Sequence, residues 1–164
     1  MEELEYYHLT PWSLEYELRS NNDVLVKFKY PKLFGTSAFV ETKKGKYRIE
    51  RQGILRPVVK IFDEINPSLE LTTVKLGFLA TSKFSTMNLN GNEYRWRRKW
   101  FEYVLLDSSD KELLKFNPVK LVTLYGAKGL KVGSVEIFDS VKQMNEFDWL
   151  VPLILYLSGP HKRG

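Results

Sequence analysis

The chain of 164 residues carries a net charge of +5, is 43% apolar and 14% aromatic, and contains no cysteine. The apolar share excludes a disordered chain, and the missing cysteines exclude a disulfide scaffold, thiolate metal sites and a cysteine nucleophile. The length fits a single domain over 1–164, and the modest positive charge suits either solubility or attraction to phosphate-rich partners.

No segment of the sequence has the pattern of a membrane anchor. The N-terminal MEELEYYHLT is acidic and lacks an apolar h-region, so no secretory signal is predicted. The longest apolar run, WLVPLILYL at 149–157, is far shorter than the ~20 residues that a membrane-spanning helix needs. We therefore expect a cytoplasmic protein without a transmembrane segment. At most, it associates with a membrane as a peripheral protein.

Short strand patterns separated by turn residues run from roughly residue 14 to residue 140. Gly45 in the turn KKGK can take a positive φ. Asn90-Gly91 is the strongest hairpin signal, because a type I′ turn needs positive φ at both central residues. GLKVGS at 129–134 is interpreted as a turn followed by a bulge. The strand-like segments are 24–30, 37–42, 46–51, 57–65, 69–80, 83–89, 94–103, 103–107, 112–117 and 130–138.

The last part of the chain has the pattern of a helix, over roughly 146–158. Asp148 is a plausible N-cap, Pro152 suits an early turn, and Gly159-Pro160 forms a stop. The apolar residues cover every face, so this helix must be enclosed on all sides or lie in a membrane. Because it is too short to span a bilayer, we expect a cylinder of antiparallel strands around it.

Four segments carry a resemblance to a known family. They are NGNEYRW (90–96), YVLLD (103–107), GSVEIF (133–138) and EFDWLVPLILYL (146–157). In this order they resemble the tubby C-terminal-like superfamily, which includes the LURP-one-related and phospholipid-scramblase-like proteins. The resemblance implies a mainly β fold, an antiparallel β-barrel of about twelve strands enclosing a hydrophobic C-terminal α-helix.

For function, the resemblance implies a non-enzymatic domain that binds anionic ligands such as phospholipid head groups as a membrane-peripheral adaptor. Tubby proteins bind phosphoinositide head groups through basic barrel residues, but their lysine and arginine pair matches no particular positions here. The acylation cluster of the scramblases is excluded by the absence of cysteine. Because many relatives have no established activity, a protein–protein scaffold without a lipid role stays open as the alternative. The modest net charge disfavours nucleic acid as a partner.

The sequence lacks the common catalytic motifs. It contains no G-x-S-x-G elbow, no P-loop and no G-x-G-x-x-G fingerprint. Its two histidines, His8 and His161, are too few for a three-histidine metal site, and near the termini we expect them to be solvated. We therefore expect no enzymatic activity, no metal and no cofactor.

The stretch NEYRWRRKWFEY at 92–103 is the candidate binding site. As a strand, it places Arg95, Arg97 and Lys99 on one face and Arg98 with the tryptophans on the other. Successive cations on one face lie ~7 Å apart, a spacing that suits a row of phosphates or lipid head groups. The candidate anion- or lipid-binding residues are Arg95, Arg97, Arg98 and Lys99. The alternative is an outward face whose cations pair with acids on neighbouring strands.

The apolar phase of this stretch reverses after Trp100, because Tyr103 and Leu105 continue the phase that the cations held. A β-bulge or strand break near 98–101 is therefore predicted. If no bulge turns it outward, Arg98 points inward and needs a buried acid, an exposed position at the barrel mouth or a bound anion. A helix, with aromatic residues at i, i+4 and i+7, is the competing local interpretation.

Overall fold

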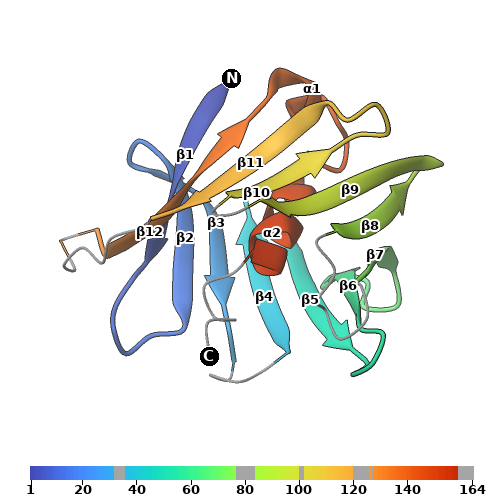
Figure 1. Ribbon diagram of the computed structural model, residues 1–164. Coiled ribbons are helices and arrows are strands. Elements are labelled where there is room, and N and C mark those ends of the chain that lie inside the picture. The colour runs from blue at the N-terminus through green and yellow to red at the C-terminus, as the bar shows by residue number, and fades with distance from the viewer. Residues whose placement is uncertain (32–35, 77–83, 100–101, 120–125, 127, 159–164) are drawn as a thin grey trace.

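The computed structural model describes residues 1–31, 36–76, 84–99, 102–119, 126 and 128–158, with only the backbone of Phe84 and Lys99. These residues contain twelve strands and two helices (Figure 1). The strands are β1 (Glu2–His8), β2 (Glu15–Ser20), β3 (Asp23–Lys29), β4 (Ser37–Thr42), β5 (Lys46–Gln52), β6 (Val58–Asp63), β7 (Glu70–Lys75), β8 (Phe84–Leu89), β9 (Asn92–Lys99), β10 (Glu102–Leu106), β11 (Glu112–Pro118) and β12 (Leu130–Ile137). The helices are α1 (Asp139–Lys142) and α2 (Phe147–Ser158).

The strands form a closed antiparallel barrel. Each strand pairs with its neighbours in the chain, and β1 pairs with β12 to complete the wall. The mainly β fold that the sequence predicted, a barrel of about twelve strands with a hydrophobic C-terminal helix, is confirmed. Strand β1 lies before the range 14–140 in which strands were expected. Its acidic composition hid an alternation in which Leu4 and Tyr6 are buried between exposed or half-buried glutamates.

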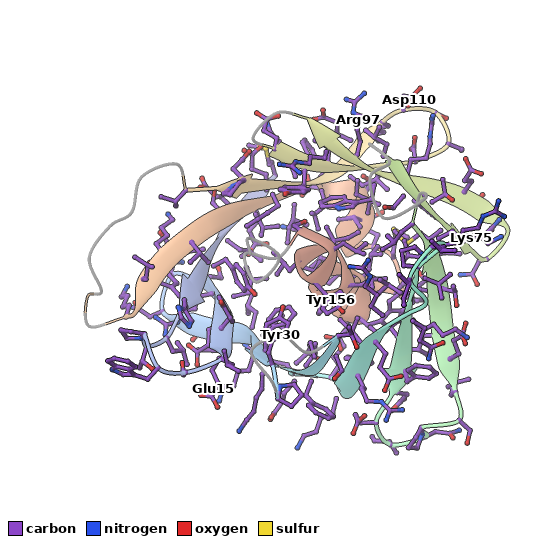
Figure 2. The ribbon with its side chains drawn as sticks, turned by 60° about the horizontal axis from the view of Figure 1, so that its bottom comes forward. Glu15, Tyr30, Lys75, Arg97, Asp110 and Tyr156 are labelled. Carbon is purple, nitrogen blue, oxygen red and sulfur yellow. The ribbon has the colours of Figure 1, made fainter. Side chains whose placement is uncertain are left out.

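Helix α2 lies inside the barrel (Figure 2). Every residue from Trp149 to Ser158 is buried, so no face of the helix is left to solvent. The predicted enclosure is confirmed. The helix begins at Phe147, one residue later than predicted, and ends at Ser158 as predicted. Asp148 lies within the first turn rather than at the N-cap, and its carboxylate accepts hydrogen bonds from the Thr42 hydroxyl (2.5 Å) and the Tyr47 hydroxyl (2.7 Å).

Aromatic side chains fill the interior beside the helix. Tyr6 packs against Phe28 and Phe116 with centroid separations of 5.7 and 6.1 Å. Tyr30 stacks on Tyr156 of α2 at 6.4 Å, and both project into the centre of the barrel in Figure 2. Burial raises the pKa of Tyr6 and Tyr30 well above the ordinary value of a phenol. The barrel interior is therefore a packed core in this half of the molecule.

The backbone conformations of two turns can be compared with what their sequences indicated. Asn90 (φ 52°) and Gly91 (φ 81°) both have positive φ, which confirms the predicted type I′ turn between β8 and β9. Gly45 does not adopt the positive φ that a glycine allows. That turn is closed by the Thr42 hydroxyl, which accepts hydrogen bonds from the Lys44 and Gly45 backbone amides. A Cβ at position 45 would lie 2.8 Å from the Tyr47 hydroxyl oxygen, so a larger residue there would require the Tyr47 side chain to shift.

The bulge predicted around 129–134 is present in β12. The pairing of β1 with β12 shifts by one residue between Tyr6, opposite Gly133, and Tyr7, opposite Lys131. A Cβ on Gly133 would lie 2.7 Å from Cζ of Phe116, so this glycine makes room for an aromatic ring of the core. The local sequence signal and the packing requirement coincide here.

Candidate functional site

The stretch NEYRWRRKWFEY forms a hairpin and not one barrel strand. Strand β9 ends at Lys99, β10 begins at Glu102, and these two residues face each other in an antiparallel ladder. The predicted break near 98–101 is therefore confirmed, although its cause differs from an inserted residue. Positions 100–101 lie outside the described residues. Because the paired residues Lys99 and Glu102 differ by an odd number, the inward-facing residues change from even-numbered positions in β9 to odd-numbered positions in β10. This change explains the reversed phase.

Two of the four candidate cations lie on the outer face of β9. Arg95 forms an ion pair with Asp110 (2.7 Å), as the alternative interpretation of paired cations expected. Arg97 is half-buried and forms no ion pair with the described residues, and its Nε is buried without a hydrogen-bond partner. The side chain of Lys99 lies outside the described part. The predicted row of cations is thus divided between one paired and one unpaired arginine.

Arg98 lies on the inner face of β9 near the mouth of the barrel. It is opposite Tyr103 of β10, and its guanidinium carbon lies 5.9 Å from the centroid of that ring. The Tyr103 ring in turn stacks on Trp96, which is buried, at 5.8 Å. Arg98 itself is exposed. Of the three environments considered from the sequence, the structure has the exposed position at the mouth, with a cation–π contact in place of a buried acid.

Charge is distributed unequally between the two ends of the barrel. Because an antiparallel meander turns alternately at opposite ends, one end carries the β1–β2, β3–β4, β5–β6, β7–β8, β9–β10 and β11–β12 connections. Four acidic residues lie in these connections or among the three nearest residues of the strands that flank them, namely Glu15, Glu17, Glu50 and Glu102. The opposite end carries most of the acids. The acids at that end include Asp23, Asp63, Glu93, Asp107, Asp110, Asp139 and Glu146.

The first of these two ends, which we call the basic end, displays several cations without acidic partners. Their side chains form no ion pair with any described residue, in contrast to Lys29, which pairs with Glu15 (3.4 Å). Lys131 is also engaged, since its hydrogen bond to Glu5 (2.7 Å) lowers the pKa of Glu5 and raises the pKa of Lys131. The unpaired cations of the basic end are Arg51, Arg56, Lys75, Arg97, Arg98 and Lys128.

Apolar side chains are exposed in the same connections. Trp12, between β1 and β2, is 94% exposed. Ile54 and Leu55, between β5 and β6, are 82% and 61% exposed. These two connections lie along the lower edge of the molecule in Figure 1. The basic end therefore combines unpaired cations with exposed large apolar groups.

The sequence identified Arg98 and Arg97 but not the other residues of the basic end. Arg51 lies at the end of a predicted strand, and Trp12 and Arg56 lie in connections without any motif. His8 was expected to be solvated, but it lies half-buried in β1, stacked on Tyr16 at 4.5 Å. His161 lies outside the described residues. Among the described residues, no group of three or more His, Asp or Glu side chains could hold a metal ion.

No family model, curated protein or solved structure matches the chain. Among the described helices, none has the length and apolar character required to cross a membrane.

Proposed function

We propose that this protein is a non-enzymatic, cytoplasmic domain that binds anionic phospholipid surfaces through its basic end. The observation that carries the proposal is the unequal distribution of charge along the barrel. The basic end has unpaired cations and few acids, whereas the opposite end has most of the acids beside its own unpaired lysines, such as Lys43, Lys44 and Lys46. Near an anionic membrane each lysine or arginine contributes about 1 kcal/mol of attraction. Such a separation of charge would also orient the molecule with its basic end toward the membrane.

Trp12, Ile54 and Leu55 supply the second contribution to the proposed contact. Tryptophan has an apolar body and a polar N–H, and it is favoured at the boundary between head groups and hydrocarbon. Insertion of these side chains would remove from water apolar groups that the free protein leaves exposed. The enclosed terminal helix and the twelve-strand barrel also support a place for the chain in the tubby C-terminal-like superfamily, where the resemblance suggested it.

The test is sedimentation with vesicles of phosphatidylcholine alone and with added phosphatidylserine or a phosphoinositide. We expect pelleting with the anionic vesicles only, which declines as salt is raised. A charge-reversed variant, Arg51→Glu with Arg56→Glu, should lose this binding. The matched control, Lys43→Glu with Lys44→Glu, makes the same charge change in the β4–β5 hairpin at the other end and should retain it.

Equal pelleting with neutral and anionic vesicles, or equal losses in both double variants, would overturn the proposal. The second candidate function is a protein-binding scaffold that uses the same cations. It would be favoured if the Arg51 and Arg56 variant lost a stable protein partner while the unaltered protein ignored every vesicle. A change in tryptophan fluorescence on vesicle binding that disappears in Trp12→Phe would localise the contact to this end.

A further inference from the structure

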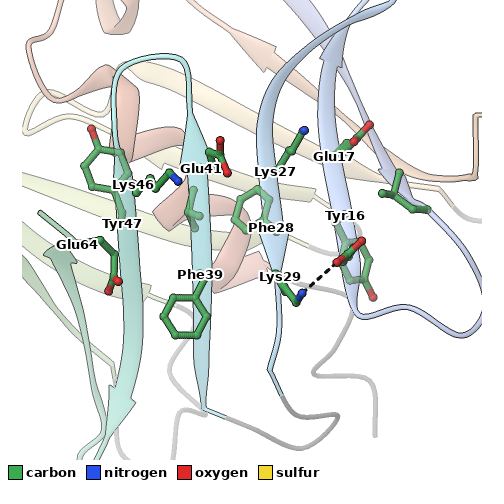
Figure 3. A pocket seen from close by; sticks show the side chains of 13 residues that line it. Tyr16, Glu17, Lys27, Phe28, Lys29, Phe39, Glu41, Lys46, Tyr47 and Glu64 are labelled. Atoms are coloured by element: carbon green, nitrogen blue, oxygen red, sulfur yellow. Dashed lines mark ion pairs between the residues drawn. The ribbon is translucent and has the colours of Figure 1, made fainter.

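A hollow of about 400 Å³ lies on the outer wall of the barrel, over β2, β3, β4 and β5 (Figure 3). Its lining combines charged side chains of both signs with the ring of Phe39, which is 41% exposed. None of the unpaired cations of the basic end lines it. The hollow therefore needs an explanation that is independent of lipid binding.

The charged side chains of the hollow alternate in sign from strand to strand. Glu17 of β2 is opposite Lys27 of β3, and Lys27 is opposite Glu41 of β4. Glu41 is in turn opposite Lys46 of β5. Neighbouring strands are spaced by about 4.8 Å, so the backbones of Lys27 and Lys46 are roughly 10 Å apart with Glu41 between them.

Several charges around the edge of the hollow are already engaged. Glu17 accepts hydrogen bonds of 2.8 and 2.6 Å from the Arg19 guanidinium. Glu15 pairs with Lys29 (3.4 Å), and Glu64 pairs with Arg48 (3.5 Å). Each of these groups has its own counter-charge in the protein, so the edge of the hollow is close to electrically balanced.

The central three charges are not engaged in this way. Lys27, Glu41 and Lys46 are exposed, and none forms an ion pair or side-chain hydrogen bond with any described residue. In Figure 3 the side chains of Glu41 and Lys46 lie next to each other over β4 and β5, and Lys27 lies on the other side of Glu41. Lys27 and Lys46 thus flank the Glu41 carboxylate. The ring of Phe39 lies two residues before Glu41 in β4.

We propose that this hollow binds a small zwitterion in which an ammonium group lies between two carboxylates, such as an acidic amino acid or a short acidic peptide. The ammonium of the ligand donates hydrogen bonds to Glu41, and its carboxylates accept them from Lys27 and Lys46. The methylene groups of the ligand pack against Phe39. The volume of the hollow accommodates a molecule of this size but not a folded domain.

The experiment is a two-dimensional amide NMR titration of the whole protein with L-glutamate, with the dipeptide of two glutamates, and with glutarate, which lacks the ammonium. We expect saturable shifts at Lys27, Phe39, Glu41 and Lys46 with the first two compounds. Glu41→Gln should weaken binding of glutamate by about tenfold, the effect of losing one charged hydrogen bond. The same substitution should leave glutarate binding unchanged or tighter, because it removes a repelling carboxylate.

Lys46→Gln should weaken all three compounds, and Lys43→Gln is the matched control in the same hairpin, outside the hollow. Absence of saturable shifts at the four amides would overturn the proposal, as would equal losses for glutamate and glutarate in Glu41→Gln. The vesicle experiment uses other residues and another surface, so either proposal can fail while the other stands.

Discussion

The Tyr47 hydroxyl donates a hydrogen bond of 2.7 Å to the carboxylate of Asp148, and this bond fastens the first turn of α2 to the β4–β5 hairpin. The Thr42 hydroxyl donates to the same oxygen (2.5 Å). We predict that Asp148→Ala lowers the free energy of unfolding by about 1–3 kcal/mol, because the Tyr47 hydroxyl loses its acceptor and the Thr42 hydroxyl keeps only the Gly45 carbonyl oxygen (3.2 Å). Urea unfolding of this variant, with Asp23→Ala as an exposed control, measures the effect. A change no larger than that of the control would contradict the anchoring role.

The buried tyrosines predict a loss of stability at alkaline pH. Burial, followed by the hydrogen bond to Asp148, raises the pKa of Tyr47, and burial raises the pKa of Tyr156 to about 12. A phenol whose folded-state pKa is raised stabilises the protein fully below its unfolded pKa of about 10, and this contribution is lost as pH increases further. Melting temperatures should therefore be flat with respect to these groups below about pH 10 and fall above it. Tyr156→Phe should make the fall shallower, and an unchanged slope would argue against burial as its cause.

The enclosure of α2 predicts that substitutions on opposite faces of the helix are equally harmful. Leu153 and Leu155 are both fully buried, and two residues along a helix turn by about 200°, so they point to nearly opposite sides. We expect Leu153→Ala and Leu155→Ala each to lower the free energy of unfolding by about 2–5 kcal/mol. A helix packed on the barrel by one face would tolerate one of the two, and that outcome in denaturant titrations would refute enclosure.

Substitution of Gly133 should cause a steric clash that a second substitution partly relieves. Gly133→Ala should destabilise the protein by about 1–3 kcal/mol, because the new methyl group overlaps the Phe116 ring and also lies 2.9 Å from the Asn117 carbonyl oxygen. A smaller residue at 116 should reduce that cost, so the double variant with Phe116→Leu should be less destabilised than the sum of the single variants. Gly126→Ala is the control, since the nearest atom to a Cβ at that position is 4.0 Å away. Strict additivity would exclude the proposed overlap.

The barrel and its helix were predictable because both depend on patterns within one segment. Alternation identified most strands, and the all-apolar character of 149–157 required an enclosing wall. Strand β1 was missed since its glutamates dominate a short segment. The β9–β10 turn was located only as a break, because an inserted residue and a chain reversal invert the parity of inward residues in the same way.

The basic end could not be predicted from the sequence, since it depends on which connections lie at the same end of the barrel. An error of one strand in the count moves every later connection to the opposite end. No strand segment was predicted for β1 or β2, and the strand predicted at 94–103 ran across the actual turn between Lys99 and Glu102. Arg98 was therefore placed within a strand rather than at the same end as Arg56. The environment of Arg98 also depends on Tyr103, which becomes its neighbour only through the β9–β10 hairpin.

The pairing of β1 with β12 has a consequence for the order of folding. The ribosome makes β1 first, but the wall cannot close until β12 has emerged, and α2 follows β12 in the chain. A wall that closed early would exclude the helix that forms its core. We therefore expect the nascent chain to remain open until β12 and α2 have been synthesised, with the β1–β12 seam forming together with or after insertion of the helix. Such long-range closure is slow compared with local pairing, and unpaired strand edges favour aggregation in the meantime.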